Sequence, residues 1–186
     1  MVWLILNTIF ILVAFVSFWY GFWVIGLVSV LLSVSTLWTW RFGAAWDPTP
    51  MRIVKKIFDL VDLKENDVIY DLGCGDGRLI IEAVKRYNCR AVGVELDPLR
   101  YLITLARVKL MKLDDRIEVI WGNIFKQNLR NATVVFCFLT QETNTKLEEK
   151  LTKELPYGTL VISYVWRFPS LRLINVIDDE VFIYLI

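Results

Sequence analysis

The sequence contains no histidine, and its only cysteines are Cys74, Cys89 and Cys137. Without histidine, catalysis by a histidine acid or base is excluded, and so are most zinc sites. The cysteines form no C-x-x-C pair, and an odd number of scattered thiols indicates neither a disulfide framework nor a metal site. We therefore expect no bound metal and a reducing compartment around the folded protein.

A second absence divides the chain, because residues 1–40 contain no Asp, Glu, Lys or Arg. All 21 basic and 20 acidic side chains fall in residues 41–186, a length that can bury one sizeable core. The net charge of +1 lacks the basic excess that phosphate binding normally requires, so we expect no nucleic-acid partner. The sequence predicts two parts, an apolar N-terminal segment and a globular domain.

The uncharged segment is too long for one straight membrane span. Forty residues would form about 60 Å of helix, roughly twice the thickness of the hydrocarbon core. We therefore predict a transmembrane helical hairpin, residues 2–18 and 22–39, with bilayer lipid as its partner. A single tilted span and a cleaved signal peptide are the alternatives, and the missing basic n-region disfavours the second. Aromatic residues, which favour membrane interfaces, cluster around Gly21 and at both ends of the segment: Trp3, Phe18, Trp19, Tyr20, Phe22, Trp23, Trp38 and Trp40.

Basic residues follow the apolar segment at Arg41, Arg52, Lys55 and Lys56, opposed nearby by Asp47. Positively charged residues flanking a membrane segment favour the cytoplasmic side. The expected localisation is therefore the membrane, with the globular domain on its cytoplasmic side.

Residues 41–62 are predicted to form a linker and a lead-in helix, and residues 63–186 the main domain. Pro48 and Pro50 stiffen the linker, because proline fixes φ and disfavours helix in the preceding residue. Thr49 is expected to cap the following helix, with Pro50 at the first helical position.

The most informative motif of the domain is the turn Asp71-Leu72-Gly73-Cys74-Gly75-Asp76-Gly77, between an apolar run at 68–70 and a helical pattern. Glycines let a nucleotide-like ligand approach the backbone beside a helix N-terminus. A dinucleotide fingerprint needs glycine at the sixth position of the turn, where this chain has Arg78. Glu95 ends the next predicted strand, where nucleotide-binding folds place a carboxylate for ribose hydroxyls. The spacing therefore favours a nucleotide-like cofactor that is not a dinucleotide.

Buried apolar runs alternate with helical patterns through the rest of the domain. This alternation predicts a parallel α/β sheet with ligands at its carboxyl edge, and the last two strands predict an antiparallel hairpin. Helices are expected after Gly77, from Asp97 and after Thr140. The predicted strands are 68–70, 91–95, 117–121, 133–139, 160–165, 171–177 and 181–186.

The combined motifs resemble those of small seven-β-strand, class I protein-lysine methyltransferases that use S-adenosylmethionine (SAM), a family with soluble archaeal and membrane-anchored mitochondrial members. The resemblance spans about residues 47–168. It rests on the glycine turn, Pro48-Thr49-Pro50, Gly122-Asn123, Phe138-Leu139 and Asn144. It implies a Rossmann-like fold, SAM as the cofactor, and as acceptor a lysine of a protein substrate associated with the membrane.

The resemblance also implies which residues bind SAM. Asp71 and the glycine turn would hold the amino-acid portion, Glu95 the ribose, and Asn123 with Ile124 the adenine. Cys74 lies within the turn as a small tolerated residue rather than a nucleophile. The expected cofactor-binding residues are Thr49, Asp71, Gly73, Cys74, Gly75, Gly77, Glu95, Leu96, Asn123 and Ile124.

By the same resemblance, Phe138, Thr140 and Asn144 are the expected catalytic residues beside the transferred methyl group. A lysine amine has an unperturbed pKa of about 10.4, so the site must favour its neutral form, and apolar surroundings do so. Aromatic residues after the fifth strand are expected to contribute: Tyr164, Trp166 and Phe168.

Two other functions stay open from the sequence. Methylation of a lipid or another hydrophobic small molecule fits the apolar hairpin and the lack of a large substrate-recognition insertion. A SAM-binding membrane scaffold without activity is disfavoured, because every position of the glycine turn is intact.

Overall fold

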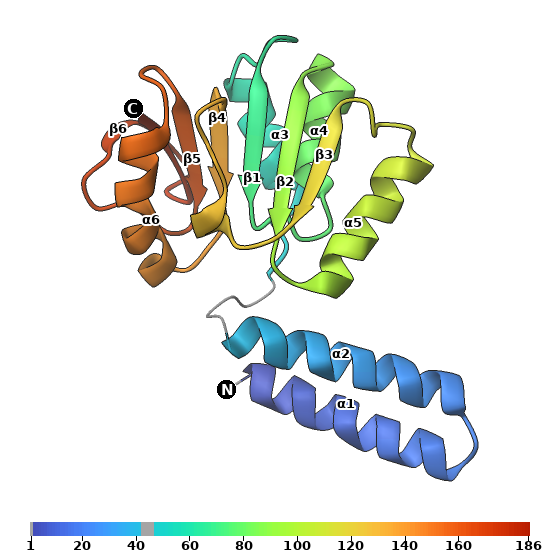
Figure 1. Cartoon of the computed structure of the whole chain (residues 1–186). Helices are drawn as coiled ribbons and strands as arrows, with labels where there is room; N and C mark the ends of the chain where they lie inside the picture. The colour runs from blue at the N-terminus through green and yellow to red at the C-terminus, as the bar shows by residue number, and fades with distance from the viewer. Residues whose placement is uncertain (1, 42–46) are drawn as a thin grey trace. The chain divides into compact units, whose positions relative to one another are not determined.

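The computed structural model describes residues 2–41 and 47–186, and at positions 2–4, 36 and 38–41 it describes the backbone only. The chain divides into two compact units at Asp47 and Pro48 (Figure 1). The first unit contains two helices, and the second contains a seven-stranded sheet with helices packed on it. Each unit is described by itself.

The N-terminal unit is a hairpin of α1 (Val2–Trp19) and α2 (Trp23–Arg41). The turn between them contains Gly21, whose φ of +78° lies in the left-handed region that favours glycine. The Phe22 N–H donates to the Ser17 carbonyl across this turn at 2.7 Å. The sequence thus predicted the two helices and their turn.

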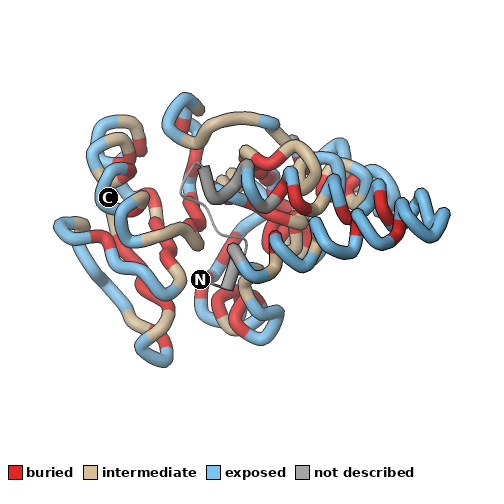
Figure 2. The backbone as a smooth tube through the Cα atoms, turned by 90° about the horizontal axis from the view of Figure 1, so that it is seen from below, coloured by how far each residue is buried: buried red, intermediate tan, exposed pale blue. Residues whose placement is uncertain are grey.

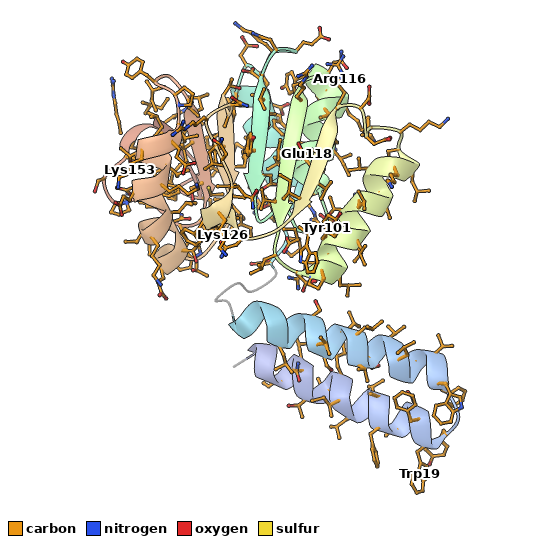
Figure 3. The ribbon with its side chains drawn as sticks, in the orientation of Figure 1. Trp19, Tyr101, Arg116, Glu118, Lys126 and Lys153 are labelled. Atoms are coloured by element: carbon orange, nitrogen blue, oxygen red, sulfur yellow. The ribbon has the colours of Figure 1, made fainter. Side chains whose placement is uncertain are left out.

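In this hairpin exposed residues outnumber buried ones (Figure 2). The buried residues are small or polar, and the exposed ones include large apolar side chains. Asn7 Nδ2 of α1 donates to the Ser33 carbonyl of α2 at 3.0 Å, and both residues are buried. Leu12 and Phe15 are 58% and 68% exposed, and Trp19 projects outward beside the turn (Figure 3). The other buried residues in the described part of the hairpin are Ala14, Ser17, Gly26, Ser29 and Ser35.

The prediction that these helices cross a membrane is not supported. Within the described residues, no helix combines the length and the apolarity that a membrane crossing requires. The sequence argument used the apolar content of residues 1–40 as a whole, whereas a crossing must be made by an individual helix. The expected interfacial positions of Trp3, Trp38 and Trp40 concern side chains outside the described residues.

The second unit is built on a sheet with strand order β3-β2-β1-β4-β5-β7-β6. The first five strands are parallel, and β7 lies antiparallel between β5 and β6. This confirms the predicted parallel sheet with an antiparallel end. The strands are β1 (Val68–Leu72), β2 (Arg90–Glu95), β3 (Ile117–Trp121), β4 (Val134–Cys137), β5 (Leu160–Tyr164), β6 (Arg172–Ile177) and β7 (Val181–Leu185).

Helices cover both faces of the sheet (Figure 1). Alternate strand residues face opposite sides, so Ile69 of β1 packs in one apolar cluster and Leu72 in the other. The first cluster includes residues of α3 (Met51–Leu60), α4 (Arg78–Tyr87) and α5 (Pro98–Leu110). The second includes Leu147 and Leu151 of α6 (Gln141–Glu154).

The first residues of α5 and α3 can be compared with the helix starts expected from the sequence. The helix expected from Asp97 is α5, and the Asp97 carboxylate caps it by accepting hydrogen bonds from the N–H groups of Leu99 and Arg100, at 2.8 and 3.0 Å. The prediction for α3 is wrong, because Pro50 occupies the N-cap position and no side chain caps this helix. Thr49 therefore lies one residue too early to cap α3.

Candidate functional site

The glycine turn leaves β1 at the carboxyl edge of the sheet and leads into α4. Gly77 has a φ of +73°, and a Cβ at this position would lie 2.5 Å from Thr104 Cγ2, so no side chain fits there. Thr104 Oγ1 donates to the Gly75 carbonyl at 2.6 Å, and the Gly73 N–H donates to the Val94 carbonyl at 2.9 Å. These contacts hold the turn against α5 and the end of β2.

Glu95, at the end of β2, is buried directly beneath this turn. Its Oε2 accepts the Gly75 N–H and its Oε1 accepts the Asp97 N–H, each at 2.8 Å. Burial raises the pKa of the Glu95 carboxyl, although these two hydrogen bonds oppose the shift. Each carboxylate oxygen keeps a further lone pair, so Glu95 can still accept from the two hydroxyls of a ribose.

Asp71 lies buried on β1, between β2 and β4. Burial, together with the negative charges of Glu95 and Asp76, raises the pKa of its carboxyl to about 7. A ligand cation beside Asp71 would favour the ionised carboxylate. The strand order changes direction between β1 and β4, and ligands of open α/β sheets bind at such a switch point.

Cys74 is buried within the turn, and burial raises the pKa of its thiol well above the usual value. A thiol that stays protonated is a poor nucleophile. The structure therefore agrees with a packing role for this cysteine.

Two arginines bind Asp76, and sequence reasoning predicted neither contact. Arg78 contacts the carboxylate through Nε at 2.8 Å and Nη2 at 2.9 Å, and Arg107 of α5 contacts it at 2.8 Å. Arg78 Nη1 also donates to the Thr49 carbonyl at 3.1 Å, which brings the linker beside the glycine turn. Arg107 follows its partner by 31 residues, so no local pattern indicated the pair.

The residues expected around the adenine lie at the ends of β2 and β3. The Gly122 N–H donates to the Glu95 carbonyl at 2.8 Å and joins the two strand ends. Asn123 Oδ1 accepts the Phe125 N–H at 2.9 Å and caps the short helix η1 (Ile124–Lys126). Leu96 and Ile124 are half-buried at the same sheet edge.

Trp121 adds a contact that the sequence did not indicate. Its Nε1 donates to the Leu96 carbonyl at 3.1 Å, and its ring stacks on Tyr101 with 6.4 Å between centroids. Figure 3 shows Tyr101 of α5 beside the carboxyl end of β3.

The three expected catalytic residues lie around the connection from β4 to α6. Phe138 packs edge-on against Tyr164, with 4.7 Å between ring centroids. Thr140 caps α6 by accepting the Thr143 N–H at 3.3 Å. Asn144 is fully buried and donates to groups at the end of β5. Phe138, Tyr164 and Thr140 are half-buried and can be reached by a ligand, whereas Asn144 cannot.

Phe168 does not join this aromatic pair. It is buried edge-on against the Tyr184 ring, and its N–H donates to the Tyr184 hydroxyl at 3.0 Å. In the part of the chain that the structure describes, no group of His, Cys, Asp or Glu is arranged to hold a metal ion.

A protein-family model matches the part of the sequence that forms the carboxyl edge described above. It is described as the ANTKMT methyltransferase domain and matches residues 71–174, from Asp71 into the first half of β6. The chain belongs to the ANTKMT methyltransferase domain family. The resemblance drawn from the motifs is thereby confirmed.

Two similar proteins are named as lysine methyltransferases. A protein-lysine N-methyltransferase of Saccharolobus islandicus strain REY15A is 41% identical over 118 residues, which cover 63% of this chain and 73% of that protein. The adenine nucleotide translocase lysine N-methyltransferase of Mus musculus is 28% identical over 161 residues, which cover 80% of this chain and 69% of that protein.

A similar crystal structure identifies the cofactor. It is an RNA methyltransferase from Salinibacter ruber in complex with S-adenosyl-L-homocysteine, with 33% identity and a TM-score of 0.70 over 74% of this chain and 91% of that chain. S-adenosylhomocysteine is what remains of SAM after methyl transfer. This member of the ANTKMT methyltransferase domain family is a SAM-dependent methyltransferase with the class I fold. The buried carboxyl groups of Asp71 and Glu95, beside the exposed Gly73, fit SAM, which contains an ammonium group and a ribose.

Proposed function

We propose that this enzyme transfers methyl groups from SAM to the side-chain amine of a lysine in a protein. The supporting observation is the 41% identity, over 118 residues, to a protein named as a protein-lysine N-methyltransferase. A second relative, at 28% identity, is also named for lysine methylation. The aromatic pair Phe138 and Tyr164 agrees with an amine acceptor, because it offers an apolar surface at the carboxyl edge.

The residues of this chain would divide the task between them. Asp71 would pair with the ammonium group of SAM, Glu95 would accept from its ribose hydroxyls, and Asn123 with Ile124 would contact the adenine. SAM supplies a methyl group on a sulfonium, which reacts with a neutral amine aligned within about 3 to 3.5 Å. Phe138 and Tyr164 would exclude water from the acceptor and favour the neutral amine.

A general base is not needed, since the ammonium can lose its proton to water before transfer. Glu142 at the start of α6 is exposed and bonded to Lys146 at 2.6 Å, and its pKa is lowered by that contact. It therefore does not serve as a base in this proposal.

The test uses the full chain, labelled SAM, and lysine-containing proteins from host membranes, followed by mass spectrometry of the labelled products. The new methyl groups should lie on lysine, and the rate should rise about tenfold per pH unit between pH 7 and 9, following the neutral amine. The variant Glu95→Ala, with weakened SAM binding, is the control for methylation that does not come from this site. Label found only in lipid or only in RNA would contradict the proposal and assign the acceptor to that class.

We also propose that the N-terminal hairpin associates with lipid and keeps the methyltransferase domain at the cytoplasmic face of a membrane. The supporting observations are the uncharged residues 1–40 and the outward-facing apolar side chains of α1 and α2. The full chain should float with lipid vesicles in a density gradient, and residues 48–186 should not. Methylation of membrane proteins should fall in the shortened protein through lost effective concentration, while SAM affinity stays within about twofold. Flotation of the shortened protein would contradict this role of the hairpin.

A further inference from the structure

A buried set of hydrogen bonds joins the start of α6 to the end of β5. Asn144 and Ser163 are both 0% exposed. Asn144 Nδ2 donates to Ser163 Oγ at 3.0 Å and to the Trp166 carbonyl at 3.0 Å. Ser163 Oγ donates to the same carbonyl at 2.5 Å. Because a carbonyl can only accept, both donors have a fixed direction.

The orientation of the Asn144 amide leaves its own acceptor unsatisfied. Oδ1 is buried and has no hydrogen-bond partner within the described residues. Turning the amide over would place Oδ1 against the Trp166 carbonyl oxygen, so that contact determines the orientation. Buried unsatisfied acceptors are rare in native proteins. The arrangement therefore holds the Trp166 carbonyl in place while Oδ1 goes without a hydrogen bond.

The segment held in this way is a strained turn. Val165 has a φ of +69°, in the left-handed region that β-branched residues rarely adopt. Its N–H donates to the Glu180 carbonyl at 2.7 Å, and the Trp166 N–H donates to the Tyr164 carbonyl at 2.9 Å. Such strain persists only where the surroundings fix the backbone, and it is found preferentially at functional sites. Tyr164, which precedes the strained residue, is the partner of Phe138.

We propose that Asn144 and Ser163 are positioning residues, which hold the turn at Val165 so that Tyr164 and Phe138 form the wall of the methyl-acceptor pocket. This inference rests on the proposed function, since it assigns the acceptor pocket. Asn144 is completely buried, so it acts through the Trp166 carbonyl and does not touch the reacting atoms. This differs from the catalytic role that the family resemblance implied for Asn144.

The test compares two hydroxyl deletions at opposite ends of β5. Ser163→Ala removes a hydroxyl from the proposed network. Thr159→Val is the matched control, because Thr159 is 2% exposed and its Oγ1 donates to the Ala132 carbonyl at 3.1 Å before β5 begins. Each change removes one buried hydroxyl bonded to a backbone carbonyl.

Ser163→Ala should lower kcat for a lysine peptide by about tenfold to a hundredfold, because small displacements of positioning groups have effects of that size. Its Kd for SAM should stay within about twofold of wild type, and Thr159→Val should change neither quantity. Asn144→Ala should act in the same direction as Ser163→Ala. An unchanged kcat in folded Ser163→Ala, or an equal loss in Thr159→Val, overturns the proposal.

Hydrogen–deuterium exchange gives a second readout that needs no methyl acceptor. The amides of Val165 and Trp166 should exchange faster in Ser163→Ala than in wild type, and at the wild-type rate in Thr159→Val. Unchanged exchange in Ser163→Ala overturns the positioning role. If wild type methylates no lysine, the proposed function fails, and the exchange comparison still decides whether this network holds the turn.

Discussion

The two units of this protein bury opposite kinds of side chain. The methyltransferase domain buries apolar residues such as Ile69 and Leu147, and its charged groups lie mostly at the surface. The helical hairpin buries Asn7 and several serines, while large apolar side chains face outward. Burying apolar area away from water is favourable, so the exposed apolar side chains of the hairpin are the surface that the proposed contact with lipid would cover.

This difference shows that the amino-acid composition of a segment does not tell which of its side chains are buried. The missing charges of residues 1–40 indicated an apolar segment but gave no account of what lies between its helices. The structure adds a polar contact between them, from Asn7 to the Ser33 carbonyl. A polar contact between helices is the expected stabiliser where the surrounding medium is as apolar as the side chains themselves.

The largest expected effect concerns pH, which should act on the domain alone because residues 1–40 contain no Asp, Glu, Lys, Arg or His. Asp71 has a pKa of about 7 in the fold and an unfolded value near 3.8. Between pH 3.8 and pH 7 the Asp71 carboxyl is more often protonated in the folded state than in the unfolded state. The contribution of Asp71 to the free energy of unfolding therefore falls as pH rises and is lost above pH 7. The loss between pH 5 and pH 8 should be about 3 kcal/mol in the protein without SAM.

Urea unfolding of residues 48–186 at pH 5 and pH 8 measures this loss. Asp71→Asn should remove most of the difference, whereas Asp115→Asn, at an exposed position, should keep it. A variant Asp71→Asn with the full pH dependence of wild type would show that other groups cause it.

The next effect compares two equally exposed leucines in the middle of helices. Leu12 of α1 is 58% exposed and Leu102 of α5 is 57% exposed. If lipid covers the hairpin, Leu12→Lys should weaken vesicle binding by about 2.5 kcal/mol, roughly seventyfold. Leu102→Lys should leave vesicle binding unchanged. Equal results for the two variants in a flotation assay would remove the proposed distinction between the surfaces.

A third effect is confined to the cofactor site. Glu95→Ala removes a charged hydrogen-bond acceptor, so the free energy of SAM binding should weaken by about 2 kcal/mol. The Kd for SAM should rise by roughly tenfold to a hundredfold. Glu65→Ala, at an exposed residue that contacts Arg116, is the control. Calorimetry should give the same loss in the full chain and in residues 48–186. A loss in the full chain only would mean that the hairpin contributes to the cofactor site.

The smallest effect lies inside the hairpin. Asn7→Ala removes the hydrogen bond to the Ser33 carbonyl, and such contacts between helices contribute about 0.6 to 1 kcal/mol. Amides of α1 and α2 should therefore exchange about threefold to fivefold faster, measured by hydrogen–deuterium exchange in vesicles. Exchange within the domain should be unaffected, and faster exchange there would show that the two units are coupled.

Local patterns predicted most of the fold. The strands lie within two residues of their predicted bounds, because each is a short apolar run between turn residues. The places of Gly77 in a turn and of Glu95 at a strand end could be predicted for the same reason, since turns and strand ends have local sequence patterns. The apolar content of the hairpin was also visible, whereas the prediction that it crosses a membrane is not supported.

Contacts between distant residues could not be predicted in this way. Asp76 and Arg107 are 31 residues apart, and Asn144 and Ser163 are 19 residues apart. Only the packing of α5 and α6 on the sheet brings these pairs together. The expected cap at Thr49 failed for a different reason, because capping depends on which residue begins the helix, and a shift of one residue changes the answer.

The position of β7 has a consequence for the order in which the domain can form during synthesis. Residues 160–164 of β5 pair with residues 181–185 of β7. One edge of β5 is therefore unpaired until residues 181–185 have emerged from the ribosome. The glycine turn, Glu95 and Asn144 are all translated earlier. An open apolar strand edge can pair with other chains. The open edge of β5 is therefore a site where the incomplete chain could pair with other chains until β7 has formed.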